Sequence, residues 1–325
     1  MKTTREKNPL ALGLFCAALL AGHGAGAQVF PNKPLRIIVP APPGNTSDAA
    51  VRLIGQKMSV PLGQPVVVEN RAGASGSIGT NAGLRAAPDG YTLTMISSTS
   101  TVAAMHLIKN LPYNPMTEMA PIASFFSVAT VIVGAKNLAP NTFKELVDYA
   151  KARPGALSYA YSNATGAVIG ASVKQVAGID WVAISYKAGT QAVTELLGGQ
   201  VPIMINDIAL TLPHIRAGSV KPYAVTSARR SNVIPDVPTL SELLPERVEF
   251  FGWTGFVAPL GTPQPVVNRL NAVVNEILKT EEMNVFLRNM GAEPVIHTPE
   301  QLAAYIKSEE PKWGNALKAA GIQPE

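Results

Sequence analysis

Two short polar turns carry the residue types with the clearest chemical use in this chain of 325 residues. Each turn follows an apolar run and precedes a stretch with helical spacing, so a helix is expected to begin there. The first backbone N–H groups of a helix have no partner inside it, and the helix dipole adds partial positive charge. Such a start can bind a carboxylate without a basic side chain. The residues are Gly44, Asn45, Thr46, Ser47 and Asp48 in the first turn, and Ser162, Asn163, Ala164, Thr165 and Gly166 in the second.

Helix capping is the competing explanation, because Ser, Thr, Asn and Asp are the preferred capping residues. Taken alone, each turn is better explained as a cap. If both helices point into one cleft, however, a carboxylate could accept several hydrogen bonds from N–H and O–H groups. Charge-assisted bonds contribute about 1.5–3 kcal/mol each, and micromolar binding needs only about 8 kcal/mol. The paired turns could therefore hold a carboxylate without an ion pair.

A glycine-rich stretch at residues 73–79 could suggest a nucleotide site or a nucleophile. It does not match G-x-G-x-x-G, and no P-loop lysine follows it. Around Ser77 it narrowly misses the G-x-S-x-G nucleophile elbow. The histidines after residue 27 are His106, His214 and His297, which are scattered and have no metal-ligand spacing. We expect no metal and no cofactor, and an exported serine hydrolase using Ser77 stays an alternative.

Alternating strands and helices are expected to position the two turns. Short apolar, β-branched runs predict strands, and stretches with helical spacing follow several of them. This order predicts an α/β fold with mostly parallel, doubly wound sheets, divided into two lobes because of the chain length. The tail is predicted to be helical and to pack back on the first lobe. The predicted strands are 35–39, 65–69, 91–96, 130–134, 156–161, 201–205, 223–227 and 250–258, and the main helices are 143–152, 167–177, 265–279 and 299–320.

The N-terminal segment has the features of an export signal. Basic residues precede an apolar run at 10–21, and an A-x-A cleavage signal ends at Ala27. A signal peptide of residues 1–27 is expected, with a membrane anchor as the alternative. The single cysteine, Cys16, lies inside this segment, so neither disulfides nor thiol chemistry is expected in the mature chain. A formal net charge of +5 is too small to indicate a nucleic-acid partner.

The chain resembles the periplasmic receptors of tripartite tricarboxylate transporters, also called Bug receptors. The matching segments follow one another in the family's order. They are residues 31–44 (PNKPLRIIVPAPPG), 66–73 (VVVENRAG), 87–93 (APDGYTL), 186–187 (YK), 195–201 (ELLGGQV), 224–230 (AVTSARR), 235–239 (PDVPT) and 258–263 (APLGTP).

The resemblance implies a periplasmic, two-lobed Venus-flytrap fold of the type II binding proteins, with two strands crossing between the lobes. Lobe 1 is expected to comprise residues 28–124 and 251–325, and lobe 2 residues 125–250. The implied function is capture of a small carboxylate by the two turns and delivery to a permease of one large and one small subunit. A monomer is expected. Ser98 and Asp207 are further expected ligand contacts, and Tyr161 could stack on a flat ligand.

The chain departs from the family pattern within both turns. Asn45 stands where the family usually has a second glycine. The second turn usually reads like S-G-x-G-S, so Asn163 and Thr165 replace glycines, and Gly166 replaces the closing serine. The usual His-Leu beyond it is Ile169-Gly170 here. These changes point to an altered pocket, for which an aromatic or aliphatic dicarboxylate is the hypothesis. A ligand-binding partner of a membrane sensor kinase is a further alternative, because it would share the fold.

Overall fold

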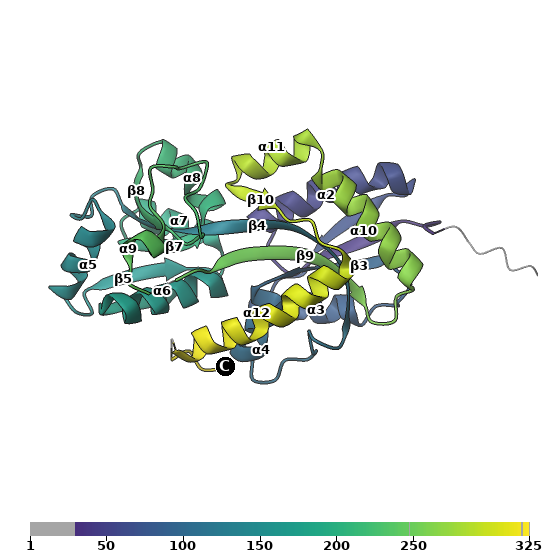
Figure 1. The fold of residues 1–325 in the computed structure, drawn as a ribbon, viewed down its shortest axis with the longest axis horizontal. Coiled ribbons are helices and arrows are strands. Elements are labelled where there is room, and N and C mark those ends of the chain that lie inside the picture. Colours follow the sequence, from purple (N-terminus) through teal and green to yellow (C-terminus); the bar gives the residue numbers. More distant parts are fainter. Residues whose placement is uncertain (1–29, 247, 320, 325) are drawn as a thin grey trace, which may run out of the picture.

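A computed structural model describes residues 30–246, 248–319 and 321–324 of the chain (Figure 1). The predicted signal peptide, with Cys16 and the cleavage position after Ala27, lies outside the described residues. Two α/β lobes lie side by side, and two long strands run through both of them (Figure 1). The predicted two-lobed fold with two crossing strands is therefore confirmed.

The first lobe is built on three parallel strands with helices following them. The strands are β1 (Leu35–Val39), β2 (Val66–Asn70) and β3 (Thr92–Ser97), and β1 lies between the other two. Strand β1 is rich in apolar, β-branched residues and mostly buried, as suits a strand covered on both faces. The connecting segments hold α2 (Thr46–Leu62), η1 (Ala74–Gly76) and α3 (Ser77–Leu84); η2 (Thr99–Ala103) and α4 (Ala104–Leu107) follow β3.

The crossing strands are β4 (Met119–Ala135) and β9 (Phe251–Pro259), which pair with each other antiparallel. Strand β9 continues the first-lobe sheet by pairing with β3. Strand β4 pairs with β9 up to Ala129 and with β7 (Ile203–Asp207) from Thr130 onward. The change of partner between these neighbouring residues marks where one lobe's sheet passes into the other.

The second lobe repeats the arrangement of the first. Parallel strands β5 (Leu157–Tyr161), β6 (Trp181–Ser185) and β7 form its sheet, and β8 (Val220–Val225) pairs with β4 on the other side. Its helices are α5 (Phe143–Lys151), α6 (Ala164–Ala177), α7 (Gly189–Leu197), α8 (Ile208–Arg216) and α9 (Leu240–Leu243). Helix α6 begins three residues before the predicted helix at 167, because Asn163 caps it.

The tail comprises α10 (Gln264–Leu278), α11 (Glu281–Asn289), β10 (Ala292–Pro294) and α12 (Pro299–Ala319). As predicted, α10 packs on the first lobe, where it contacts α2 and β4. The prediction is incomplete for α12, which contacts η2 in the first lobe and also α6 in the second (Figure 1). Trp313 of α12 is fully buried, with its ring 5.4 Å from that of Phe250. Among the described residues, no helix is long and apolar enough to cross a membrane.

Candidate ligand-binding site

Two asparagines cap the helices that begin at the polar turns. The Asn45 side chain accepts a hydrogen bond from the Asp48 N–H at 2.7 Å, at the start of α2. The Asn163 side chain accepts one from the Gly166 N–H at 2.9 Å, at the start of α6. Capping is therefore real in both lobes. The residues that supply it are two of those at which the resemblance predicts a departure from the family pattern.

The caps leave the first two backbone N–H groups of each helix without a hydrogen-bond partner among the described residues. In each first turn the third N–H of the helix is bound to the capping side chain. The two N–H groups before it have no partner among the described residues. These groups belong to Thr46 and Ser47 in α2, and to Ala164 and Thr165 in α6. Each lobe thus presents a pair of free amide donors in a region of partial positive charge.

Asp48 organises the first turn from inside. Its carboxylate accepts hydrogen bonds from the Gly44 N–H at 2.9 Å, from Asn70 at 2.9 Å and from Arg52 at 3.1 Å. Burial opposes ionisation, but the bonds from Arg52, Gly44 and Asn70 outweigh it, so the pKa of Asp48 is lowered. Gly44 has φ +82°, in the left-handed region that favours glycine. Asp48 therefore stabilises the conformation of the turn, and its negative charge is balanced by the ion pair with Arg52.

A polar network surrounds the start of α6. Asn206, at the end of β7, donates to the Ser162 hydroxyl at 2.6 Å. The Asn163 amide nitrogen lies 3.4 Å from the Asn206 side-chain oxygen and 3.3 Å from the Asp207 carboxylate. Gly189, at the start of α7, also packs here, since a Cβ on it would lie 3.2 Å from the Ser162 hydroxyl oxygen. The turns after β5, β6 and β7 thus meet at one point.

Asp207 carries the titratable carboxyl of this network. It stands at the capping position of α8, but its side chain does not cap that helix. The residue keeps some exposure while its carboxyl lies among closely packed protein atoms. This burial raises the pKa of Asp207 to about 6, although the hydrogen bond from Asn163 acts in the opposite direction.

Strand β9 connects this network to the first lobe. The Ser98 N–H donates to the Trp253 carbonyl at 3.2 Å. A Cβ on the preceding Gly252 would lie 3.7 Å from the Asp207 carboxylate. The structure thereby brings Ser98, Asp207 and Asn163 to neighbouring places at the lobe junction.

The segment that follows β1 packs against η1 and η2 in the first lobe. A Cβ on Gly76 would lie 3.0 Å from the carbonyl of Pro40, at the end of β1, and 3.1 Å from the Cβ of Ser100 in η2. Segment η2 in turn contacts α6. These contacts connect the end of β1 in the first lobe with α6 in the second lobe through η2.

The remaining predicted residues differ in accessibility. Thr165 and Ser98 are almost fully buried, at 1% and 2% exposure. Tyr161 is half-buried at the end of β5, with its ring 5.9 Å from that of Tyr159. Gly166 is packed so tightly that a Cβ would lie 2.5 Å from the Ile205 carbonyl. Among the predicted residues, the half-buried Ser47 and Tyr161 are thus more accessible than Ser98 and Thr165.

The alternative catalytic residues lie in structural contacts. Ser77 is buried at the start of α3. His106 bonds to Glu310 of α12 at 2.9 Å, and His297 bonds to Ser124 at 2.8 Å. Among the described residues, no group of His, Cys, Asp or Glu could hold a metal ion.

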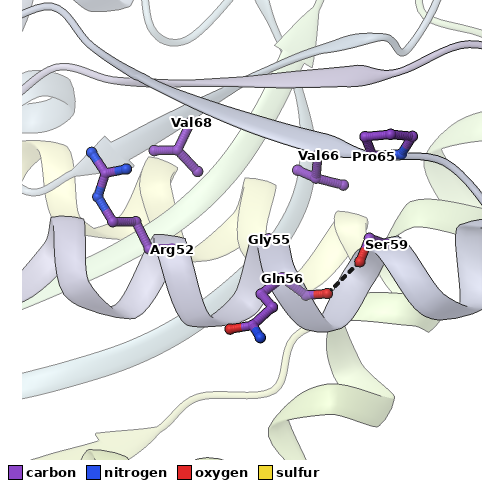
Figure 2. A pocket seen from close by; sticks show the side chains of 7 residues that line it. All are labelled: Arg52, Gly55, Gln56, Ser59, Pro65, Val66 and Val68. Atoms are coloured by element: carbon purple, nitrogen blue, oxygen red, sulfur yellow. Dashed lines mark hydrogen bonds between the residues drawn. The ribbon is translucent and has the colours of Figure 1, made fainter.

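A surface groove of about 400 Å³ lies on the outer flank of the first lobe, between α2 and β2 (Figure 2). A second groove of similar size lies beside His106 and α12. Neither is lined by the two polar turns. Arg52 lines the first groove and also bonds Asp48, so it connects the groove to the first turn.

Comparison with known proteins identifies the same receptor family over most of the chain. The Tripartite tricarboxylate transporter family receptor (TctC) family matches residues 50–322. Protein BugT of Bordetella pertussis is 35% identical over 317 residues, which cover 96% of this chain and 97% of BugT.

Two solved structures from Rhodopseudomonas palustris are similar in fold. One, with adipate, has a TM-score of 0.87 and 30% identity, and the match covers 91% of this chain and 100% of that chain. MatC with bound malate has a TM-score of 0.80 and 29% identity, and the match covers 89% of this chain and 100% of MatC.

Two lobes joined by crossing strands define a periplasmic-binding-protein fold and the solute-binding class. Within that class, the chain belongs to the tripartite tricarboxylate transporter receptor family, which includes the Bug proteins.

Proposed function

We propose that this protein captures a small carboxylate between the starts of α2 and α6 and delivers it to a tripartite tricarboxylate-type permease. The observation that carries the proposal is the pair of free amides in each first turn, at Thr46 and Ser47 and at Ala164 and Thr165. Four N–H groups match the acceptor capacity of one carboxylate. Ser47 and Tyr161 would contact the rest of the ligand.

Family membership and the ligands of two neighbours support a carboxylate. Adipate and malate, present in the two R. palustris structures, are both aliphatic dicarboxylates. An aliphatic or aromatic dicarboxylate is therefore the proposed ligand class. The lobes would divide near residues 124 and 250, and closure about β4 and β9 would bury the ligand. We further propose export to the periplasm with cleavage after Ala27, a monomer, a permease of one large and one small subunit, and no catalysis.

Calorimetry of the purified protein tests this function. The titrants are aliphatic and aromatic mono- and dicarboxylates, each paired with its methyl ester. The acids should bind at micromolar concentration or below, and the esters should neither bind nor be hydrolysed. Ester turnover would favour a hydrolase, and failure of every acid to bind would overturn the proposal.

A pair of variants places the site. Ser47→Trp should abolish binding, because Ser47 is half-buried in the first turn of α2. Ser308→Trp is the matched control, since Ser308 is exposed on α12. Thr165 is unsuitable for this test because it is almost fully buried and a larger side chain would disturb folding. Equal affinities of the two variants would place the ligand elsewhere.

A further inference from the structure

Asp207 places a negative group beside a site built for an anion. Its carboxyl lies 3.3 Å from the Asn163 amide, one residue from the free N–H groups at the start of α6. A carboxylate bound to those N–H groups would therefore lie close to Asp207. Two carboxylates at such a distance repel each other unless a proton or a hydrogen-bond donor lies between them. The site needs something to offset this repulsion.

The protein itself supplies few hydrogen-bond donors to the Asp207 carboxylate. Among the described residues, the Asn163 amide is the only side chain that donates to the Asp207 carboxylate, at a long distance of 3.3 Å. In the part of the chain that the structure describes, the groups that face Asp207 are uncharged. They are Asn163, which caps α6, Asn206 of β7, Gly252 of β9 and Thr130, which lies opposite Asp207 on β4. Asp48, by contrast, accepts three hydrogen bonds and has Arg52 as a counter-ion. Asp207 therefore retains acceptor capacity that the fold leaves unused.

The position of Asp207 gives a ligand access to that capacity. Asp207 is the last residue of β7 and pairs with Thr130 where β4 changes partner from β9 to β7. Asp207 thus lies at the lobe junction, where it is partly exposed to solvent. A hydroxyl or ammonium group on the carbon next to the bound carboxylate is two bonds from the carboxyl carbon, so it could reach this acceptor.

We infer that Asp207 selects ligands that carry a hydrogen-bond donor, a hydroxyl or an ammonium group, on the carbon next to the carboxylate held at the start of α6. The inference rests on the proposed function and narrows its ligand class. An unsubstituted dicarboxylate would leave Asp207 without a partner beside a second negative charge. A 2-hydroxy or 2-amino analogue would donate to Asp207 and relieve the repulsion.

Matched ligand pairs test the inference. Malate and succinate, 2-hydroxyglutarate and glutarate, and mandelate and phenylacetate each differ by one hydroxyl group. Calorimetry at pH 7.5 should show the hydroxy acid of the binding pair to be favoured by about 10- to 100-fold, as for a hydrogen bond to a charged group. Asp207→Asn should reduce the preference to a few-fold and should strengthen binding of the unsubstituted acid. Asp180→Asn, an exposed carboxylate in the same lobe, is the control with the same charge change.

Proton linkage gives a second readout that a merely structural role of Asp207 would not produce. At pH 6, a donor-bearing ligand stabilises the Asp207 carboxylate and should release protons on binding. An unsubstituted dicarboxylate should take protons up. Titrations in buffers of different ionisation enthalpy measure both. Equal affinity within every pair, or a preference unchanged in Asp207→Asn, overturns the inference while leaving the proposed function intact. Failure of all six acids to bind would overturn both.

Discussion

The side-chain amide of Asn163 donates toward the carboxylate of Asp207 across 3.3 Å, while its oxygen caps the Gly166 N–H at 2.9 Å. One side chain thus performs two tasks at the lobe junction. It fixes the first turn of α6, and it is the side chain there that faces the buried acid. A glycine at this position could do neither.

Removing the two asparagine caps should lower the free energy of unfolding slightly, and by more for alanine than for glycine. Asn45→Ala and Asn163→Ala should each lower the free energy of unfolding by about 1 kcal/mol, whereas the glycine variants should lose only a few tenths. Urea denaturation measures the series, with Thr142→Ala at the start of α5 as a cap remote from the site. A larger loss of unfolding free energy in the glycine variants than in the alanine variants would contradict the role of Asn45 and Asn163 as helix caps.

Replacing the same caps should also alter ligand binding. Asn45→Gly frees the Asp48 N–H and Asn163→Gly frees the Gly166 N–H, so each adds a potential donor to the site. We expect changed affinity ratios across a panel of dicarboxylates, measured by calorimetry. Thr142→Gly, which uncaps α5 instead, should leave those ratios unchanged. An Asn45→Gly protein with unaltered ratios would show that this turn does not touch the ligand.

Asp207 should make the ligand-free protein less stable as pH rises. Its pKa is raised to about 6 from the ordinary 3.8, so between these values the folded protein holds a proton that the unfolded chain has lost. The resulting penalty is absent below about pH 4, grows between pH 4 and 6, and is complete above that range. Asp207→Asn should therefore raise the melting temperature at pH 7.5 and have little effect at pH 4. A constant difference between the two proteins at all pH values would contradict this assignment.

Trp313 should be among the most important side chains of the tail for stability. It is fully buried, its ring lies 5.4 Å from that of Phe250, and its indole N–H donates to Glu309 at 3.1 Å. Trp313→Ala should cost about 3–5 kcal/mol of unfolding free energy in urea denaturation. Lys307→Ala, exposed on the same helix, should change it by less than about 0.5 kcal/mol. Similar losses in the two variants would show that α12 is held by other contacts.

The local elements of the fold could be predicted from the sequence because their signals are local. An apolar β-branched run predicted β1, a short strand-like run at 156–161 predicted β5, and the polar turns predicted the starts of α2 and α6 within three residues. The crossing strands were expected from the family resemblance. The contact of α12 with both lobes was missed, because helical spacing around Trp313 shows which face is buried but not against which element.

The two polar turns could be identified from the sequence, but the contacts that their side chains make could not. Residue types alone could not show that Asn45 and Asn163 would be the caps, since Ser47 and Asp48 are equally good capping types. The role of Asp48 depends on Asn70, which follows another strand, and no local signal joins the two. The raised pKa of Asp207 depends on packing at the junction of β4 and β7, which is a property of the assembled fold.

A crystal structure with a bound carboxylate tests the central claim most directly. We predict one carboxylate within about 2.7–3.2 Å of N–H groups of Thr46 or Ser47 and of Ala164 or Thr165, with both lobes contributing. A ligand held instead in the groove lined by Arg52 and Val66, or by basic side chains away from both helix starts, would contradict it.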